Sequence, residues 1–274
     1  MPEPQFKGLR FFIAWVGTIS AYTKEIMKHT LQSIMMGGGL LAFTAVPASA
    51  EVEFEVHAGY HSIYEFRGVD FGDDMIEAGV DFSTELGSGI KLSGGVWYQD
   101  SDGNKGNAAF DELDLVVGLK KSFGNIDVSL GYTYYVFPGT TNGDTHEVYF
   151  GLATELDNGI GLGLTYYHDT DAFDAGYLEF EVTKSIEVPN NSSLSIDFSA
   201  GAAYSFEYNS DVDGSPLKGM NHYFASIAVP WQICDNTTLT PYVKYVAADS
   251  DFANSEDGKS DDLFLGGVVL SYSF

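Results

Sequence analysis

The feature that most constrains the fold of this chain is a repeated alternation of apolar and polar residues at period two. In the last segment, residues 262–274, every second residue from Phe264 to Phe274 is apolar, aromatic or Gly. This alternation is typical of a β-strand with one apolar face, because successive side chains point to opposite sides of a sheet. Twelve such segments follow residue 50, separated by clusters of Gly, Asn, Asp and Ser. The sequence therefore predicts an all-β fold.

The connections between these segments alternate in length. The expected short turns are residues 86–89, 121–125, 156–159, 187–193 and 230–236. The expected longer, more acidic loops are residues 61–74, 100–108, 138–145, 169–174, 207–218 and 248–260. Short turns at one end and long loops at the other are typical of a transmembrane barrel. We therefore expect a twelve-stranded antiparallel up-and-down transmembrane β-barrel, with both chain ends on the periplasmic side.

Two further features favour a membrane barrel over a soluble barrel or sandwich. The apolar faces of the twelve segments contain no Asp, Glu, Lys or Arg, as expected where a charge that faces lipid costs about 2–4 kcal/mol at the midplane. Tyr residues gather at the strand ends next to the long loops, as in an interfacial aromatic belt: Tyr60, Tyr98, Tyr134, Tyr166, Tyr204 and Tyr245.

The first 50 residues predict export. Lys24 and Lys28 precede an apolar run, and the small residues 48–50 form a cleavage pattern. We interpret residues 27–50 as a signal peptide cleaved after Ala50, residues 1–26 as an over-extended start or a disordered extension, and residues 51–274 as the barrel. The expected location is the outer membrane of a Gram-negative bacterium. The single Cys234 excludes an intramolecular disulfide, and the net charge of −26 argues against nucleic acid as a partner.

Two stretches resemble known proteins. The terminal Phe274 resembles the last residue of bacterial outer-membrane barrels, which implies an assembly signal read by the barrel-assembly machinery. Residues 60–69 resemble the Tyr-x-Phe-Arg-Gly first loop of a Gram-negative outer-membrane family of conserved hypothetical proteins, the Gcw_chp or TorF-like group, with residues 75–82 as its next strand. The motif residues are Tyr64, Phe66, Arg67 and Gly68. The resemblance implies fold and location but no substrate. For Arg67, pairing with nearby loop carboxylates is the favoured interpretation over ligand binding.

The residues of opposite parity should line the lumen. They include the carboxylates Glu77, Asp81, Glu112, Asp114, Asp127, Glu147, Glu155, Glu179, Glu181 and Asp197, together with Glu53, Glu55 and Glu85, against three bases, Lys91, Lys120 and Lys244. Ion pairing can neutralise only a minority of these acids, so we expect a hydrated, negative lumen rather than a dry plug. A ring of acids favours cations. The sequence therefore predicts a narrow, cation-preferring channel for small cationic or neutral solutes.

Several alternatives remain open. The inward aromatic residues could stack on a solute or fill space: Trp97, Tyr135, Tyr149, Tyr167, Tyr177 and Tyr242. A non-conducting structural or surface-binding barrel could use its acidic loops to bind divalent cations and lipopolysaccharide. An outer-membrane hydrolase, with His168 or His222 in its site, is the third hypothesis. It has little support, because no nucleophile motif is present and the histidines are expected at a solvated rim. No catalytic residue, cofactor or metal site is predicted.

Overall fold

The computed structural model describes residues 51–103, 109–138, 143–254 and 259–274. The predicted signal peptide and the extension before it lie outside these residues. No helix in the described part of the chain is long and apolar enough to cross a membrane.

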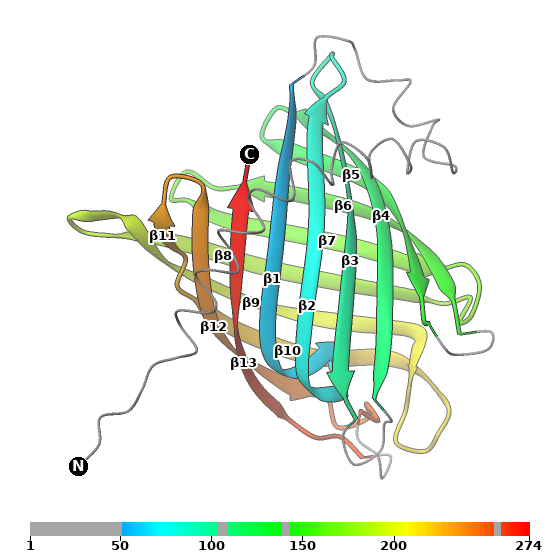
Figure 1. Ribbon diagram of the computed structural model, residues 1–274. Coiled ribbons are helices and arrows are strands. Elements are labelled where there is room, and N and C mark those ends of the chain that lie inside the picture. Colours follow the sequence, from blue (N-terminus) through cyan, green and yellow to red (C-terminus); the bar gives the residue numbers. More distant parts are fainter. Residues whose placement is uncertain (1–50, 104–108, 139–142, 255–258) are drawn as a thin grey trace, which may run out of the picture. The chain divides into compact units, whose positions relative to one another are not determined.

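The described residues form one antiparallel sheet that closes on itself (Figure 1). Its strands are β1 (Val52–Phe66), β2 (Val69–Glu85), β3 (Ile90–Asp102), β4 (Phe110–Phe123), β5 (Ile126–Val136), β6 (Thr145–Glu155), β7 (Ile160–Asp169), β8 (Gly176–Val188), β9 (Asn191–Ser210), β10 (Pro216–Ala228), β11 (Trp231–Cys234), β12 (Thr237–Ala248) and β13 (Leu263–Ser273). Apart from β10 and β11, which do not pair with each other, each strand pairs with its sequence neighbours, and β13 also pairs with β1. The predicted closed barrel is confirmed.

The wall has twelve positions because β10 and β11 are two parts of one strand. Both parts pair with β9 on one side and with β12 on the other. The break lies at Val229 and Pro230, where the proline lacks the N–H that a central ladder requires. The prediction of a turn over residues 230–236 is therefore wrong: the strand resumes at Trp231, and the turn is confined to residues 235–236.

The two faces of the sheet separate as the alternation predicts. Large apolar side chains of one parity are exposed on the outside, among them Leu130 (55% exposed) on β5 and Ile76 (54% exposed) on β2. Exposed apolar surface of this extent marks contact with a membrane or a partner rather than with water. Three tyrosines of the predicted belt donate hydrogen bonds from their hydroxyl groups to loop carboxylates: Tyr60 to Asp74, Tyr134 to Asp144 and Tyr245 to Asp262.

The ends of the barrel differ. The start of β1 and the C-terminus lie at the same end (Figure 1), which we call the terminal end; the opposite end is the loop end. At the terminal end the connections are short, for example Leu86 to Gly89 between β2 and β3. The turn predicted over residues 187–193 is shorter than expected, because the strands continue to Val188 and from Asn191.

The first predicted loop, residues 61–74, is the main departure from the sequence analysis. The strands continue through it, and only Arg67 and Gly68 form the turn. Both have positive φ, 53° and 83°, which matches a two-residue type I′ hairpin. A Cβ on Gly68 would lie 2.7 Å from His222 Nδ1 and 2.8 Å from Phe252 Cε1. This position therefore requires glycine for both its backbone conformation and its packing.

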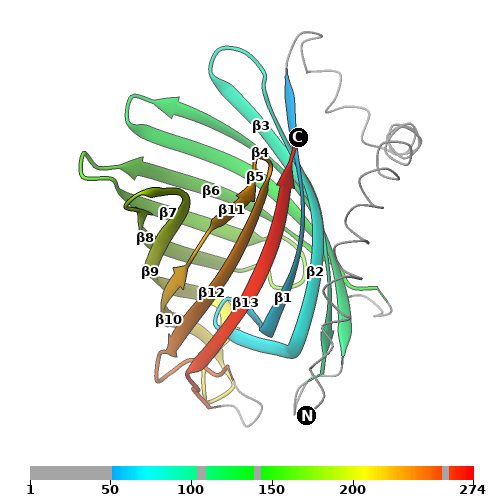
Figure 2. The ribbon, with the colours of Figure 1, turned by 60° about the vertical axis from the view of Figure 1, so that its left-hand side comes forward.

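The C-terminal residue closes the seam. Phe274 and Phe54 exchange two backbone hydrogen bonds, of 2.9 and 3.0 Å, and their rings stack with centroids 5.7 Å apart. Figure 2 shows β13 running beside β1. The predicted last strand thus joins the first, although recognition of Phe274 by the assembly machinery remains a prediction.

Two separate lysine substitutions on β5 test which of its side chains face outward. We expect Leu130→Lys to lower the free energy of unfolding in lipid vesicles by about 2–4 kcal/mol, because an ammonium group would face the hydrocarbon. Ser129→Lys, one residue away, would place the same charge on the inner face and should cost much less. Urea unfolding in vesicles measures both values. Equal costs would contradict the assignment of the faces.

Candidate functional site

The inner face of the barrel carries the candidate functional side chains. In the cross-strand register Glu77 lies opposite Gln99, and Gln99 lies opposite Glu112. Trp97 on β3 likewise lies opposite Asp114 on β4. Contacts between inner side chains divide this face into three levels: a cavity at the terminal end, a histidine and glutamate row in the middle, and a packed cluster at the loop end.

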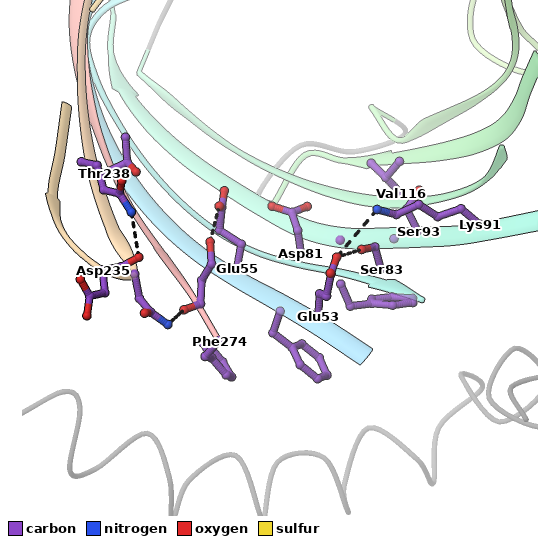
Figure 3. Close-up of a pocket in the computed structure, with 17 residues that line it drawn as sticks. Glu53, Glu55, Asp81, Ser83, Lys91, Ser93, Val116, Asp235, Thr238 and Phe274 are labelled. Atoms are coloured by element: carbon purple, nitrogen blue, oxygen red, sulfur yellow. Dashed lines mark hydrogen bonds and ion pairs between the residues drawn. The ribbon is translucent and has the colours of Figure 1, made fainter. Parts of the chain in front are cut away.

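The cavity at the terminal end has a volume of about 920 Å³. Figure 3 shows Glu53, Glu55 and Asp81 on the concave side of the wall, while Phe274 points the other way. Lys91 supplies one positive charge, with Nζ 3.8 Å from Glu53 Oε2, and the Glu53 side chain is 76% exposed. The excess of solvated carboxylates makes this cavity negative.

The middle level is centred on Glu77. Its Oε1 lies 3.3 Å from His61 Nε2 and 3.7 Å from His57 Nδ1, and its Oε2 accepts a hydrogen bond of 2.5 Å from Trp97 Nε1. The other nitrogen of His57 lies 3.3 Å from Asp81 Oδ2. These polar groups form a row of close contacts across β1, β2 and β3, although His61 Nε2 makes no hydrogen bond.

Small residues and the seam position this row. A Cβ at Gly79 would lie 2.2 Å from His57 Nε2, so only glycine leaves room for the imidazole ring. On the other side of the seam, the Tyr242 hydroxyl lies 2.6 Å from His61 Nδ1. The row therefore links the first two strands to β12.

The packed cluster at the loop end is built around Arg67, at the tip of the β1–β2 hairpin. Its Nη2 donates to both carboxylate oxygens of Glu147, at 3.0 and 2.9 Å. Arg67 is 8% exposed and Glu147 is 1% exposed. The hydroxyl of Tyr135 also donates to Glu147, at 2.7 Å. Arg67 does tie the hairpin to a carboxylate, but its partner lies on β6 and not in the first loop, where it was expected.

Four aromatic rings surround the Arg67 guanidinium. Its Cζ lies 4.5–4.8 Å from their ring centroids, within the range of cation–π attraction; the rings belong to Phe66, Tyr167, Tyr177 and Tyr208. Arg67 lies in a turn, outside the strands. Burial alone would lower its pKa, but Tyr208 and Glu147 outweigh that effect and raise it. The guanidinium therefore stays charged.

The backbone of the hairpin tip is held by β10 and by the segment between β12 and β13. Asn221 Nδ2 on β10 donates to Arg67 O at 2.8 Å, and Asn254 Nδ2 donates to Gly68 O at 2.8 Å. Strands β3, β4 and β5 separate the hairpin from Glu147 on one side, and β12 and β13 separate it from Asn221 on the other, so the hairpin tip must lie in the interior. Figure 1 shows the end of β1 turning inward at the loop end. The hairpin thus fills part of the lumen.

Two expectations are corrected at this level. The lumen is not hydrated throughout, because hairpin and wall bury the Arg67–Glu147 pair together with its aromatic neighbours. The histidines are not all at a solvated rim either: His222 is 1% exposed and His61 is 8% exposed. His168 stays near the surface, with Nε2 3.6 Å from Asp174.

The other predicted inner residues have varied surroundings. Asp127 lies 3.2 Å from Lys120 Nζ, and Asp197 accepts from Ser185 at 2.6 Å. Tyr149 packs against the backbone at Gly131, where a Cβ would lie 2.3 Å from its ring. The register places Glu155, Glu179 and Glu181 on the same face as these residues. Each predicted inner aromatic residue for which the structure describes a contact packs against another group of the protein.

Sequence reasoning missed Asn221, Asn254 and Tyr208, and it did not pair Arg67 with Glu147. All four contacts join segments that are distant in the sequence. The one available signal was Arg67 itself, the only Arg after residue 50, in a segment with a Gly suited to a tight turn.

The buried ion pair yields a stability prediction. Arg67→Met should lower the free energy of unfolding by about 3–5 kcal/mol, because Glu147 is left buried without its cation. Arg67→Met combined with Glu147→Gln should recover a large part of that loss. Denaturant unfolding of the refolded barrel measures both. Additive losses in the double variant would contradict direct pairing.

Comparisons with known proteins agree with the fold. An outer-membrane channel from Pseudomonas putida F1 superimposes with a TM-score of 0.51 at 12% identity, covering 84% of this chain and 97% of that one. The KdgM porin (TM-score 0.48, 11% identity, 81% and 99% covered) and the NanC porin (0.49, 12%, 80% and 98%) are also similar. None of the curated proteins matches the chain.

The barrel therefore shares its fold with the Pseudomonas putida outer-membrane channel. At these identities the likeness shows the fold alone. A family model described as "bacterial protein of unknown function (Gcw_chp)" matches residues 45–253, which is most of the chain. The chain belongs to the Gcw_chp family of bacterial proteins of unknown function.

Proposed function

We propose that the protein is a narrow outer-membrane channel that prefers cations and admits small cationic or neutral solutes. The observation that carries this proposal is the cavity at the terminal end, where Glu53, Glu55 and Asp81 face one base, Lys91. Such a cavity concentrates cations and repels anions, because its carboxylates are solvated and mostly unneutralised. The other inner acids of the sequence analysis extend the negative wall toward the loop end.

The inward hairpin sets the limit on passage. It occupies the lumen at the loop end, and its tip is fixed by a buried ion pair and two Asn contacts. We infer that this hairpin is the constriction of the channel and that Arg67 holds it closed. The Tyr-Glu-Phe-Arg-Gly segment would then act in the barrel as a fixed constriction, which gives the TorF-like resemblance of this loop a physical role.

A non-conducting structural or surface-binding barrel is the second candidate. The observation that favours it is the burial of the loop end, where Tyr177, His222 and Asn221 are almost fully inaccessible. The acidic loops would then contact lipopolysaccharide through divalent cations. A hydrolase has less support, because His222 is buried beside Asn221, with Nδ1 3.1 Å from the amide nitrogen, and does not face a solvated cleft.

Ion selectivity tests the main proposal. In planar bilayers with a salt gradient, the purified protein should give a reversal potential of cation-selective sign. The triple variant Glu53→Gln, Glu55→Gln, Asp81→Asn should move the reversal potential toward zero, because the cavity loses its negative charge. Asp213→Asn, in an exposed loop, is the matched control and should change little. Absence of conductance in the wild type would refute the channel, and anion selectivity would refute its cation preference.

Shortening the hairpin tests the constriction. Removal of residues 64–71 should raise the single-channel conductance several-fold, since the tip no longer crosses the lumen. Shortening the loop between β9 and β10 beyond Tyr208 by a similar length is the control and should leave conductance nearly unchanged. A conductance that stays at the wild-type level in the hairpin variant would show that the constriction lies elsewhere.

A further inference from the structure

A second group of acids lies on the inner face next to the Arg67 cluster, because Asp114 lies opposite Tyr135, which donates to Glu147. Glu112 and Asp114 are two residues apart on β4 and therefore share a face. Their carboxyl groups interact electrostatically on that face, Glu112 is 3% exposed, and Asp114 Oδ1 is buried. Neither has an ion-pair partner among the described residues. One buried contact thus holds two carboxyl groups without a protein cation.

This arrangement needs a positive charge between the two groups. Two ionised carboxylates in contact repel each other, and removing them from water adds a desolvation cost of several kcal/mol. The one described neutral donor to Glu112 is the Tyr64 hydroxyl, at 2.5 Å from Oε2. A hydroxyl group offers a single hydrogen bond and cannot neutralise two charges. The missing charge must therefore be a shared proton or a bound cation.

Unpartnered oxygen atoms beside the pair favour a bound cation. Gln99 lies directly opposite Glu112 on β3 and is 0% exposed. Its Nε2 donates to Phe110 O on β4 at 3.4 Å, while its Oε1 has no partner. Asp114 Oδ1 is also buried without a partner, and so is the hydroxyl of Ser101, at the next inner position of β3. A proton shared between the two carboxyl groups would leave Gln99 Oε1 unsatisfied, whereas a cation bound between Gln99 and the carboxylates would use it.

Aromatic residues enclose this site. The Tyr64 ring packs against Trp97, at a centroid distance of 6.1 Å, and against Phe110, at 5.8 Å. These rings limit the access of water from the lumen and strengthen electrostatic attraction inside. The enclosure also places an indole ring beside the carboxylates, which makes binding observable.

We propose that Glu112, Asp114 and Gln99 bind a divalent cation of the calcium class. Carboxylate and amide oxygens are the ligands that Ca²⁺ takes, with water completing its coordination shell. The donor set lacks the His and Cys ligands that transition metals prefer. No group of three or more His, Cys, Asp or Glu side chains in the described ranges could hold a metal ion, so the proposed site rests on two carboxylates and one amide. The site does not depend on conduction, because the cation can bind while the hairpin closes the lumen.

Terbium luminescence tests the site in the refolded full-length barrel after treatment with a chelator. Tb³⁺ replaces Ca²⁺ at oxygen sites, and Trp97 should sensitise its emission. We expect saturable emission that Ca²⁺ displaces, and a rise in the thermal unfolding midpoint on addition of Ca²⁺. Glu112→Gln and Asp114→Asn should each weaken Ca²⁺ binding by about tenfold or more, because the site loses ligand charge.

The controls separate this site from the acidic surface. Asp213→Asn should leave Ca²⁺ binding unchanged, because Asp213 lies in an exposed loop. Gln99→Met keeps both carboxylates, so it should weaken binding even if a carboxylate variant fails to fold. Three results would overturn the proposal: no sensitised emission, emission that Ca²⁺ does not displace, or equal affinity in the wild type and in the folded inner-face variants. The first of these would leave the shared proton as the missing charge.

Discussion

The structure depends on the closure of its backbone hydrogen-bond ring. A membrane core offers no water to unpaired N–H and C=O groups, so an open sheet edge there would cost several kcal/mol for each group. In this chain the edges of β1 and β13 satisfy each other, and Phe54 and Phe274 complete the ladder at the terminal end. The register of that seam determines which parity of every strand faces outward. One slipped residue would place acids on the apolar surface.

Closure also explains how a single hairpin can cross the lumen. The wall supplies all strand pairing, so the tip of β1 and β2 needs no partner strand inside the barrel. It needs only partners for its own polar groups, which Glu147, Asn221 and Asn254 provide. The inward turn at Arg67 and Gly68 is thus an extension of the wall, held by contacts between side chains and backbone. Its position depends on electrostatics together with the packing of aromatic rings around Arg67.

The sequence predicted the strands, their outward faces and the closed barrel, because period-two alternation is a local pattern. The alternation runs without interruption along β5, which carries Leu130, and along the part of β2 that carries Ile76. It failed where the backbone leaves that pattern. Residues 61–66 and 69–74 alternate less regularly, so the sequence predicts a loop there. In the structure these residues belong to the two strands of the hairpin. Pro230 resembled a turn, but it only interrupts a strand. The pairing of Arg67 with Glu147 joins residues 80 apart, and no local pattern encodes such a contact.

The distribution of charge bears on how the proposed constriction at Arg67 could open. A hairpin held by apolar packing would expose that surface when it moved, whereas a guanidinium and a carboxylate can exchange their mutual contact for water. While the tip is buried, separating Arg67 from Glu147 is costly, since each would be an unpaired ion in a site of low dielectric. Once water enters, the same groups are hydrated and the cost falls. If the hairpin is the proposed constriction, the ion pair would therefore favour two states, a buried tip and a hydrated one, over partly withdrawn positions between them.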